Sequence, residues 1–274
     1  MTITLLTGLP RSGTTLACAC LNTLPDCVAL VEPMNVPKHG DADRAVDEIV
    51  AFANTTRQRL LEKGIAPSHN VAGAIMDNSF ENVRADNGLR QMHSYVSDVK
   101  ITKPLSSEFH LFIKHPGVFT ALALQLAERF PFYAIVRHPL AALASWQTVD
   151  TNVSRGHAPA AESFAPDIRN ELAQTADLLK RQVTLLRWMF RVYAALPRSQ
   201  VVTYESIVAD PTKALAPLSR SMAPVTHPVR SFDLRARYPN VELSRLARAL
   251  LLIEEDLRVF YPRLRESMEP YLKS

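Results

Sequence analysis

Residues 8–15, "GLPRSGTT", have the features of a loop that binds a phosphate group. Gly8 and Gly13 are spaced like the glycines of the nucleotide-binding loop G-x-x-x-x-G-K-[ST], but Thr14 stands where that loop has lysine. The apolar run before the loop predicts a strand and the run after it a helix, so backbone N–H groups of residues 12–15 would face an anion at the helix N-terminus. The loop supplies one cation and three hydroxyls, on Arg11, Ser12, Thr14 and Thr15.

The missing lysine separates this loop from that of a kinase or nucleotide hydrolase. Those enzymes use lysine and Mg²⁺ because they transfer a multiply charged phosphoryl group. A sulfuryl group carries a single negative charge, so its transfer can proceed without a metal. The altered loop therefore favours a phosphosulfate donor, and we expect no metal site.

Two segments resemble the donor site of sulfotransferases that use 3′-phosphoadenosine 5′-phosphosulfate (PAPS). "PRSGTTL" (10–16) is similar to their 5′-phosphosulfate loop, in which the bacterial and tyrosylprotein types have arginine at the position of Arg11. "FYAIVRHPLAALASW" (132–146) resembles their 3′-phosphate site, where Arg137 at a strand end and Ser145 on the next helix would hold the 3′-phosphate. A strand-end salt bridge of Arg137 is the alternative.

A third segment extends the resemblance, which covers about residues 2–36 and 108–212. "VTYESIVADP" (202–211) is similar to a family segment whose tyrosine lies by the adenine, which implies that place for Tyr204; a core position is the alternative. The chain has no Arg-Lys-Gly segment near its C-terminus, so the resemblance does not identify the residues that close over the adenosine. Candidates are Arg230, Arg235 and Arg237.

The resemblance also implies which groups do the chemistry. Glu32 follows Arg11 by an interval similar to that of the catalytic glutamate in the tyrosylprotein type, so it would be the base; an ion pair with Arg11 is the structural alternative. Nearby sulfonate and phosphate charges would raise its pKa. "IKHP" (113–116) imperfectly resembles the Lys-Thr-His segment of cytosolic sulfotransferases, which makes His115 the second candidate base and Lys114 a cation on the transferring group. We expect no chemical role for His138.

The elements that must position these groups alternate along the chain. Strands are predicted at 2–7, 27–31, 110–114, 132–136 and 200–204, and helices at 14–24, 42–63, 117–129, 139–149, 168–196 and 242–260. Residues 64–70 and 154–167 are predicted as loops, the second a mobile flap. This order predicts an α/β, P-loop-like three-layer sandwich with a central parallel sheet of about five strands flanked by helices. Functional groups would gather at the carboxyl ends of the strands.

Composition sets the broader limits. The 274 residues suit one domain, 1–274, and a net charge of +4 gives no support for nucleic-acid binding. No apolar run approaches the ~20 residues of a membrane span, and no secretory signal is recognised, so a cytoplasmic location is expected. The three cysteines fit neither zinc nor disulfide spacing.

The sequence therefore predicts a PAPS-dependent sulfotransferase that acts on a hydroxyl acceptor, either a small molecule or a carbohydrate. A kinase or nucleotide hydrolase of the phosphate-loop type is the alternative enzyme. A protein that keeps a nucleotide pocket without catalysis is the third possibility.

Overall fold

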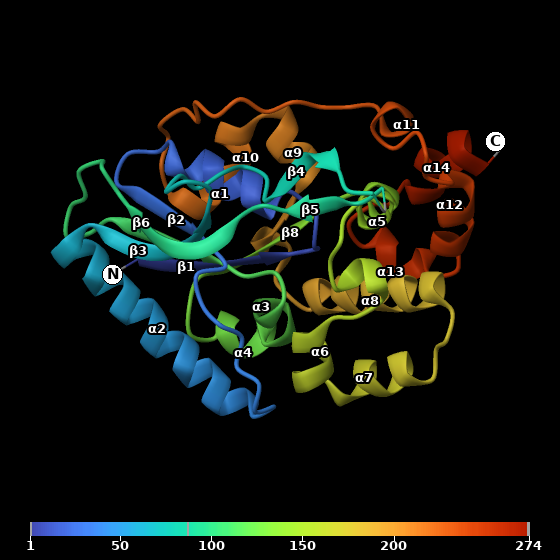
Figure 1. The fold of residues 1–274 in the computed structure, drawn as a ribbon, viewed down its shortest axis with the longest axis horizontal. Helices are drawn as coiled ribbons and strands as arrows, with labels where there is room; N and C mark the ends of the chain where they lie inside the picture. Colours follow the sequence, from blue (N-terminus) through green and yellow to red (C-terminus); the bar gives the residue numbers. More distant parts are fainter. Residues whose placement is uncertain (1, 87, 273–274) are drawn as a thin grey trace.

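The structure of this chain is a computed structural model that describes residues 2–86 and 88–272. Residues 1, 87, 273 and 274 of the expected domain lie outside the described residues. A five-stranded parallel sheet with the order β2-β7-β1-β8-β9 lies at the centre (Figure 1). Its strands are β1 (Thr2–Gly8), β2 (Cys27–Val31), β7 (His110–Lys114), β8 (Phe132–Val136) and β9 (Val201–Thr203).

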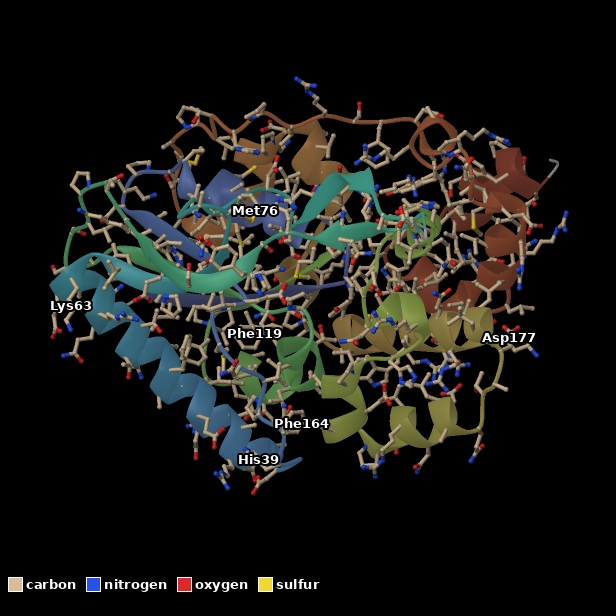
Figure 2. The ribbon with its side chains drawn as sticks, viewed as in Figure 1. His39, Lys63, Met76, Phe119, Phe164 and Asp177 are labelled. Atoms are coloured by element: carbon tan, nitrogen blue, oxygen red, sulfur yellow. The ribbon has the colours of Figure 1, made fainter. Side chains whose placement is uncertain are left out.

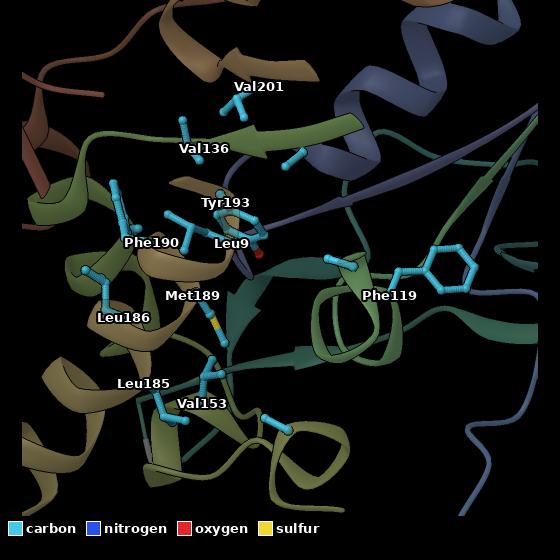
Figure 3. Close-up of a cluster of buried hydrophobic side chains, with 14 of the residues drawn as sticks. Leu9, Phe119, Val136, Val153, Leu185, Leu186, Met189, Phe190, Tyr193 and Val201 are labelled. Atoms are coloured by element: carbon cyan, nitrogen blue, oxygen red, sulfur yellow. The ribbon is translucent and has the colours of Figure 1, made fainter. Parts of the chain in front are cut away.

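Successive side chains of a strand point to opposite faces of the sheet, and in these short strands both sets are apolar. Helices therefore cover both faces. One face presents Leu6, Ala29 and Phe112 to α1, α9 and α10, and the other presents Leu5, Leu30 and Leu111 to a larger core that includes α2, α5 and α8. Figure 3 shows the α8 side chains of this larger core beside β8 and the loop after β1. The predicted α/β class and three-layer arrangement are confirmed.

The helices are distributed along the chain, and the longest one in the described residues is α2 with 22 residues. Their bounds are α1 (Thr14–Asn22), α2 (Ala42–Lys63), α3 (Val118–Ala121), α4 (Ala123–Ala127), α5 (Pro139–Trp146), α6 (Pro159–Phe164), α7 (Pro166–Ala173), α8 (Leu178–Ala194), α9 (Tyr204–Ala209), α10 (Pro211–Ser219), α11 (Leu234–Arg237), α12 (Leu243–Leu251), α13 (Glu254–Arg258) and α14 (Leu264–Leu272). Short 3₁₀ turns lie at Val153–Arg155 and Arg198–Gln200. Within the described ranges, no helix is both long and apolar enough to cross a bilayer.

Three predicted helices are interrupted. The expected helix 168–196 is two helices, α7 and α8, because Asp177 caps a new start and accepts a hydrogen bond from the Lys180 N–H. The expected helices 117–129 and 242–260 likewise break, into α3 and α4 and into α12 and α13. Tyr204 begins α9 instead of ending the last strand, since Thr203 is its N-cap. Periodicity alone does not reveal such breaks, because the apolar stripe continues through them.

Both predicted loops are wrong. Residues Ile65–Asn70 form β3, which pairs antiparallel with β6 (Tyr95–Lys100), and a second small sheet joins β4 (Phe80–Arg84) to β5 (Arg90–Met92). The expected flap contains α6 and the start of α7. Ala160 and Ala161 of α6 are buried in the core, so this segment is packed where the sequence predicted mobility. Proline begins each of these helices, a signal consistent with a helix start.

Candidate active site

The loop between β1 and α1 has the strand–turn–helix geometry of a phosphate-binding loop. Gly13 is the N-cap of α1 with φ 84°, a left-handed value that favours glycine, and no side chain caps the first turn. A Cβ on Gly13 would lie 2.5 Å from the Tyr204 ring, and one on Gly8 would lie 2.2 Å from the Ile135 carbonyl oxygen. The indole Nε1 of Trp146 donates to the Pro10 carbonyl and ties the loop to α5. The first N–H groups of α1 are thus presented without a side-chain cap, beside an aromatic ring.

Two functional residues predicted from separate strands meet at the carboxyl edge of the sheet. The Nζ of Lys114, at the end of β7, lies 2.6 Å from Oε1 of Glu32, which follows β2, and 3.4 Å from Oγ1 of Thr15. Only 3% of the Lys114 side chain is exposed, against 32% of Glu32. Glu32 has φ 44°, a strained backbone for a non-glycine residue. Glu32 therefore forms its ion pair with Lys114, and the alternative prediction of an ion pair with Arg11 is wrong.

The raised pKa expected for Glu32 depends on a bound donor, and in the protein without ligand the shift has the opposite direction. Burial alone would raise the pKa of this carboxyl, but the positive charge and hydrogen bond of Lys114, with a further contribution from His115, lower it to about 2. The expectation assumed the charges of a bound donor, and these are not part of the protein. In their absence Glu32 is ionised throughout the neutral range.

His115, the second candidate base, lies behind this pair. Its ring is 6% exposed, packs 5.7 Å from the Phe119 ring between centroids, and is not part of the wall of the cavity described below. Burial lowers the pKa of His115 to about 4, so the imidazole is neutral at neutral pH. Its Nδ1 is buried without a hydrogen-bond partner. Access to an acceptor hydroxyl therefore favours Glu32.

Arg11 lies in a second group, with Ser145 and two residues that the sequence did not single out. Its Nε donates to Ser145 Oγ at 3.3 Å, both Nη atoms lie 3.3 Å from Asn78 Oδ1, and its Cζ lies 4.6 Å from the centre of the Phe80 ring. Burial and the neighbouring Arg90 lower the pKa of Arg11 to about 10, which still leaves it charged at neutral pH. The guanidinium thus lies beside the predicted 3′-phosphate residue.

Arg137 completes this second group from the end of β8. Its Nη1 donates to the Arg11 carbonyl at 3.0 Å, and its guanidinium lies over the rings of Tyr204 at 4.6 Å and Phe232 at 4.9 Å. Its Nε is buried and has no hydrogen-bond partner among the residues that the structure describes. A buried donor left unpaired is costly in a folded protein unless a ligand or water completes it. Arg137 is therefore arranged to receive an acceptor group such as a phosphate oxygen.

Four arginines lie close together in this second group: Arg11, Arg90, Arg137 and Arg237. In the described part of the chain none of them is paired with an acidic side chain. Tyr238 lies among them and hydrogen-bonds Ser145. Burial would raise the pKa of this phenol, but Arg137 and the Ser145 bond outweigh that effect and lower it. Such a concentration of unneutralised positive charge is suited to a polyanion.

The Glu32–Lys114 pair and the side chains of Arg11 and Arg137 open into one cavity of about 960 Å³, whereas the buried Ser145 and Arg90 are not among the described residues that line it. Its wall includes Arg11, Glu32, Lys114, Arg137 and Tyr204. The cavity lies where ligands bind in open α/β sheets, beyond the carboxyl ends of the strands. Across residues 2–86 and 88–272, no group of three or more histidine, cysteine, aspartate or glutamate side chains is arranged to hold a metal ion.

Comparison with known proteins identifies the family. The sulfotransferase family matches residues 4–222, which is most of the chain. The chain belongs to the sulfotransferase family. This match includes every strand of the central sheet from β2 to β9, the loop after β1, and the segments that carry Glu32, Lys114 and Arg137.

Solved structures of other sulfotransferases are similar over much of this one. A sulfotransferase from Alicyclobacillus acidocaldarius is 15% identical, with 96% of each chain covered and a TM-score of 0.43. A sulfotransferase from Mycobacterium tuberculosis is 13% identical over 93% of this chain and 76% of its own, with a TM-score of 0.41. The sulfotransferase domain from the curacin biosynthetic pathway is 14% identical over 79% and 71%, with a TM-score of 0.34. No curated protein matches the chain at a significant level.

Several residues of this sulfotransferase's cavity were outside the sequence prediction. Asn78, Phe80 and His69 come from the small sheets and their connections, where the resemblance ends, and Tyr238 comes from the segment after α11. Of the three C-terminal arginine candidates, Arg230 and Arg237 line the cavity, while Arg235 donates to the Pro270 carbonyl. No local motif marks these positions, because they reach the site only through tertiary packing.

Ser12 is placed differently from the other loop residues. Its hydroxyl donates to the Ile135 carbonyl at 2.7 Å and its backbone N–H donates to the Leu9 carbonyl at 3.0 Å. The hydroxyl and the backbone N–H of Ser12 both donate hydrogen bonds within the protein. Binding of PAPS by Ser12 therefore stays a prediction that this geometry does not favour. Gly13, Thr14 and Thr15 lie at the start of α1, where they were expected.

Gly13→Ala should destabilise the protein more than Gly73→Ala. Both glycines have left-handed φ, 84° and 82°, so each alanine costs about 1–2 kcal/mol of backbone energy. Only at Gly13 does the new Cβ also collide with Tyr204, since nothing lies within 4 Å of one on Gly73. Urea unfolding of the two variants measures the difference, and equal losses would show that the loop does not press on Tyr204.

Proposed function

We propose that this sulfotransferase uses PAPS as donor and transfers its sulfuryl group to the hydroxyl of a small-molecule or carbohydrate acceptor, with residues 1–274 acting as one domain. The observation that carries the proposal is the group of four arginines with no acidic partner in the described chain, three of which, Arg11, Arg137 and Arg237, line the same cavity as the Glu32–Lys114 pair. A polyanionic nucleotide fits the first group. The second holds a carboxylate where an acceptor hydroxyl could reach it.

The donor is held at two ends. Its 5′-phosphosulfate is bound by the first N–H groups of α1, with Thr14, Thr15 and Lys114 nearby, because a helix N-terminus favours an anion. Its 3′-phosphate is bound by Arg137 and Ser145, and the unpaired Arg137 Nε supports that assignment. Tyr204 lies by the adenine, with the Arg137 guanidinium over its ring.

The reaction is an in-line displacement at sulfur. The acceptor oxygen forms the new O–S bond while the bond from sulfur to the 5′-phosphate oxygen breaks, and 3′,5′-adenosine bisphosphate leaves with that electron pair. Glu32 takes the proton of the acceptor hydroxyl. Lys114, Arg11 and backbone N–H groups stabilise charge on the transferring and leaving groups, so the transfer needs no metal. For Arg11 this role requires its guanidinium to turn from Ser145 and Asn78 toward the donor.

Donor binding also adjusts the base. In the free protein the pKa of Glu32 is about 2 because Lys114 is its close partner, which makes it a weak base. A bound phosphosulfate shares the Lys114 ammonium and adds negative charge beside the carboxylate, and both effects raise the pKa of Glu32. The base therefore becomes stronger only when the donor is in place.

The donor assignment predicts that 3′,5′-adenosine bisphosphate binds better than AMP. The 3′-phosphate should add about 1.5–3 kcal/mol, the contribution of hydrogen bonds to a charged group. Arg137→Ala should remove most of this difference, whereas Arg129→Ala, which loses an exposed pair with Asp47, should keep it. Isothermal titration calorimetry measures both ligands against all three proteins.

Equal affinity of the wild type for bisphosphate and AMP would remove the 3′-phosphate assignment. Preference for Mg·ATP over the bisphosphate would favour a kinase or nucleotide hydrolase. Tight bisphosphate binding without transfer to any hydroxyl would favour a nucleotide-binding protein that lacks catalysis.

A further inference from the structure

The cavity continues past the Glu32–Lys114 pair into a region that the donor residues do not line. Pro116 and Gly117 follow Lys114 and His115 directly, and both line this region. A Cβ on Gly117 would lie 3.9 Å from the Cβ of Ala160, so α6 packs against the end of β7. The whole cavity, at about 960 Å³, lies near the top of the roughly 300–1,000 Å³ found for small-molecule sites. It has room for a second, small ligand next to the reacting groups.

The wall of this region has a continuous apolar part, with the polar residues Thr151 and Asn152 beside it. The segment that begins α6 contributes four small apolar residues, and α8 contributes two large ones: Ala158, Pro159, Ala160, Ala161, Trp188 and Met189. Figure 3 shows Met189 of α8 close to Val153, which also lines the cavity. Trp188 is partly exposed, and an aromatic face of this kind favours contact with an apolar group.

This apolar wall is held rigidly from behind. The ring of His39, from the segment before α2, lies 6.4 Å from the Phe164 ring at the end of α6, measured between ring centres. Figure 2 labels both side chains near the lower end of α2. Glu162 accepts a hydrogen bond from the Ala158 N–H at 2.8 Å and fixes the start of α6. These two contacts fix the two ends of α6 and so position the apolar wall.

The charges around this region are already neutralised within the protein. At its mouth Asp150 is paired with Arg155, and His157 lies 3.2 Å from Glu162. His69 lines the cavity nearer Glu32, where burial lowers its pKa and its Nδ1 lies 3.1 Å from Ser94 Oγ. The four unpaired arginines, by contrast, lie on the donor side. Among the described residues that line this region, an anionic acceptor would meet cations that are already paired, apart from those assigned to the donor side.

We infer that this region binds an uncharged acceptor whose hydroxyl is carried on an apolar group. The inference rests on the proposed function, since it assigns the acceptor half of the same cavity. Burial of the apolar group against Trp188 and Met189 supplies the affinity, and the hydroxyl is directed to Glu32. The apolar part of the wall selects against acceptors that would place a carboxylate or several hydroxyls against it, because those groups would be desolvated there without partners.

Three acceptors of differing polarity test this inference: 4-methylphenol, 4-hydroxybenzoate and methyl glucoside. Transfer of labelled sulfate should give a kcat/KM at least tenfold higher for 4-methylphenol than for the other two. Trp188→Ala should raise KM for 4-methylphenol more than it lowers kcat, and Trp188→Arg should shift the ratio of kcat/KM toward 4-hydroxybenzoate. Leu178→Ala, an exposed position on the same helix that does not line the cavity, should change neither value.

Calorimetry also measures the binding of 3′,5′-adenosine bisphosphate to each protein. This measurement separates failure of the acceptor inference from failure of the proposed function. Equal or reversed preference among the three acceptors, or transfer to none of them with the bisphosphate still bound, would overturn the inference and leave the donor assignment standing. Loss of bisphosphate binding in the wild type would instead overturn the proposed function. A Trp188 variant that keeps bisphosphate binding but shows unchanged acceptor kinetics would also overturn the inference.

Discussion

Glu32→Gln should lower kcat by about 10²–10⁴-fold, the usual contribution of general-base catalysis. The amide keeps the shape of the side chain and can accept a hydrogen bond from Lys114, but it cannot take a proton at neutral pH. Binding of 3′,5′-adenosine bisphosphate should be unchanged or slightly tighter, because one negative charge near the phosphosulfate is removed. Steady-state transfer and calorimetry measure the two effects separately.

His115→Asn is the control for this prediction. The ring of His115 is buried and lies outside the cavity wall, so its removal should reduce kcat less than Glu32→Gln does. The opposite order, with Glu32→Gln active and His115→Asn inactive, would make His115 the base. Loss of folding in both variants, seen by circular dichroism, would mean that both residues are structural.

Lys114→Met should lower kcat by about 10²–10³-fold, which is the typical cost of losing one group that stabilises charge in the transition state. It should also move the acid limb of the pH profile of kcat/KM to higher pH. Lys114 is the main group that lowers the pKa of Glu32, so its removal raises that pKa and the carboxylate is protonated at a higher pH. In the wild type, with a pKa of about 2, Glu32 should cause no loss of activity between pH 8 and 5.

Arg59→Met is the matched control for Lys114→Met. It also breaks a 2.6 Å ion pair, with Asp98, but at the surface and away from the cavity. Neither kcat nor the acid limb should change, because exposed pairs contribute little. An unchanged acid limb in Lys114→Met would show that Glu32 does not titrate as the base of the free enzyme.

The sequence by itself determined the central sheet and the residues at its edge. Short apolar strands alternate with helices, and each strand of the sheet is followed by a polar residue, such as Arg11, Glu32, Lys114 or Arg137. The carboxyl ends of parallel strands lie at one edge, so the order of these residues along the chain already places them together. Local spacing is sufficient for this because each group is carried by its own strand.

Only the tertiary structure decided which of these side chains contact one another. Glu32 pairs with Lys114, whereas Arg11 joins Ser145, and this choice depends on side-chain directions that spacing does not encode. In the protein without donor the pKa of Glu32 is lowered because its nearest charge is a buried lysine, and the predicted rise depends on the charges of the donor.

The acceptor half of the cavity also depends on tertiary packing. Residues 154–167 look like a loop in sequence because prolines and polar residues separate their few apolar ones. They form α6 since Ala160 and Ala161 can be buried against residues that follow β7 and lie far away along the chain. Asn78 and Tyr238 reach the donor side in the same way, from segments without a recognisable motif. Burial against distant residues, which no local pattern reports, is the physical reason that this half of the site could not be read from the sequence.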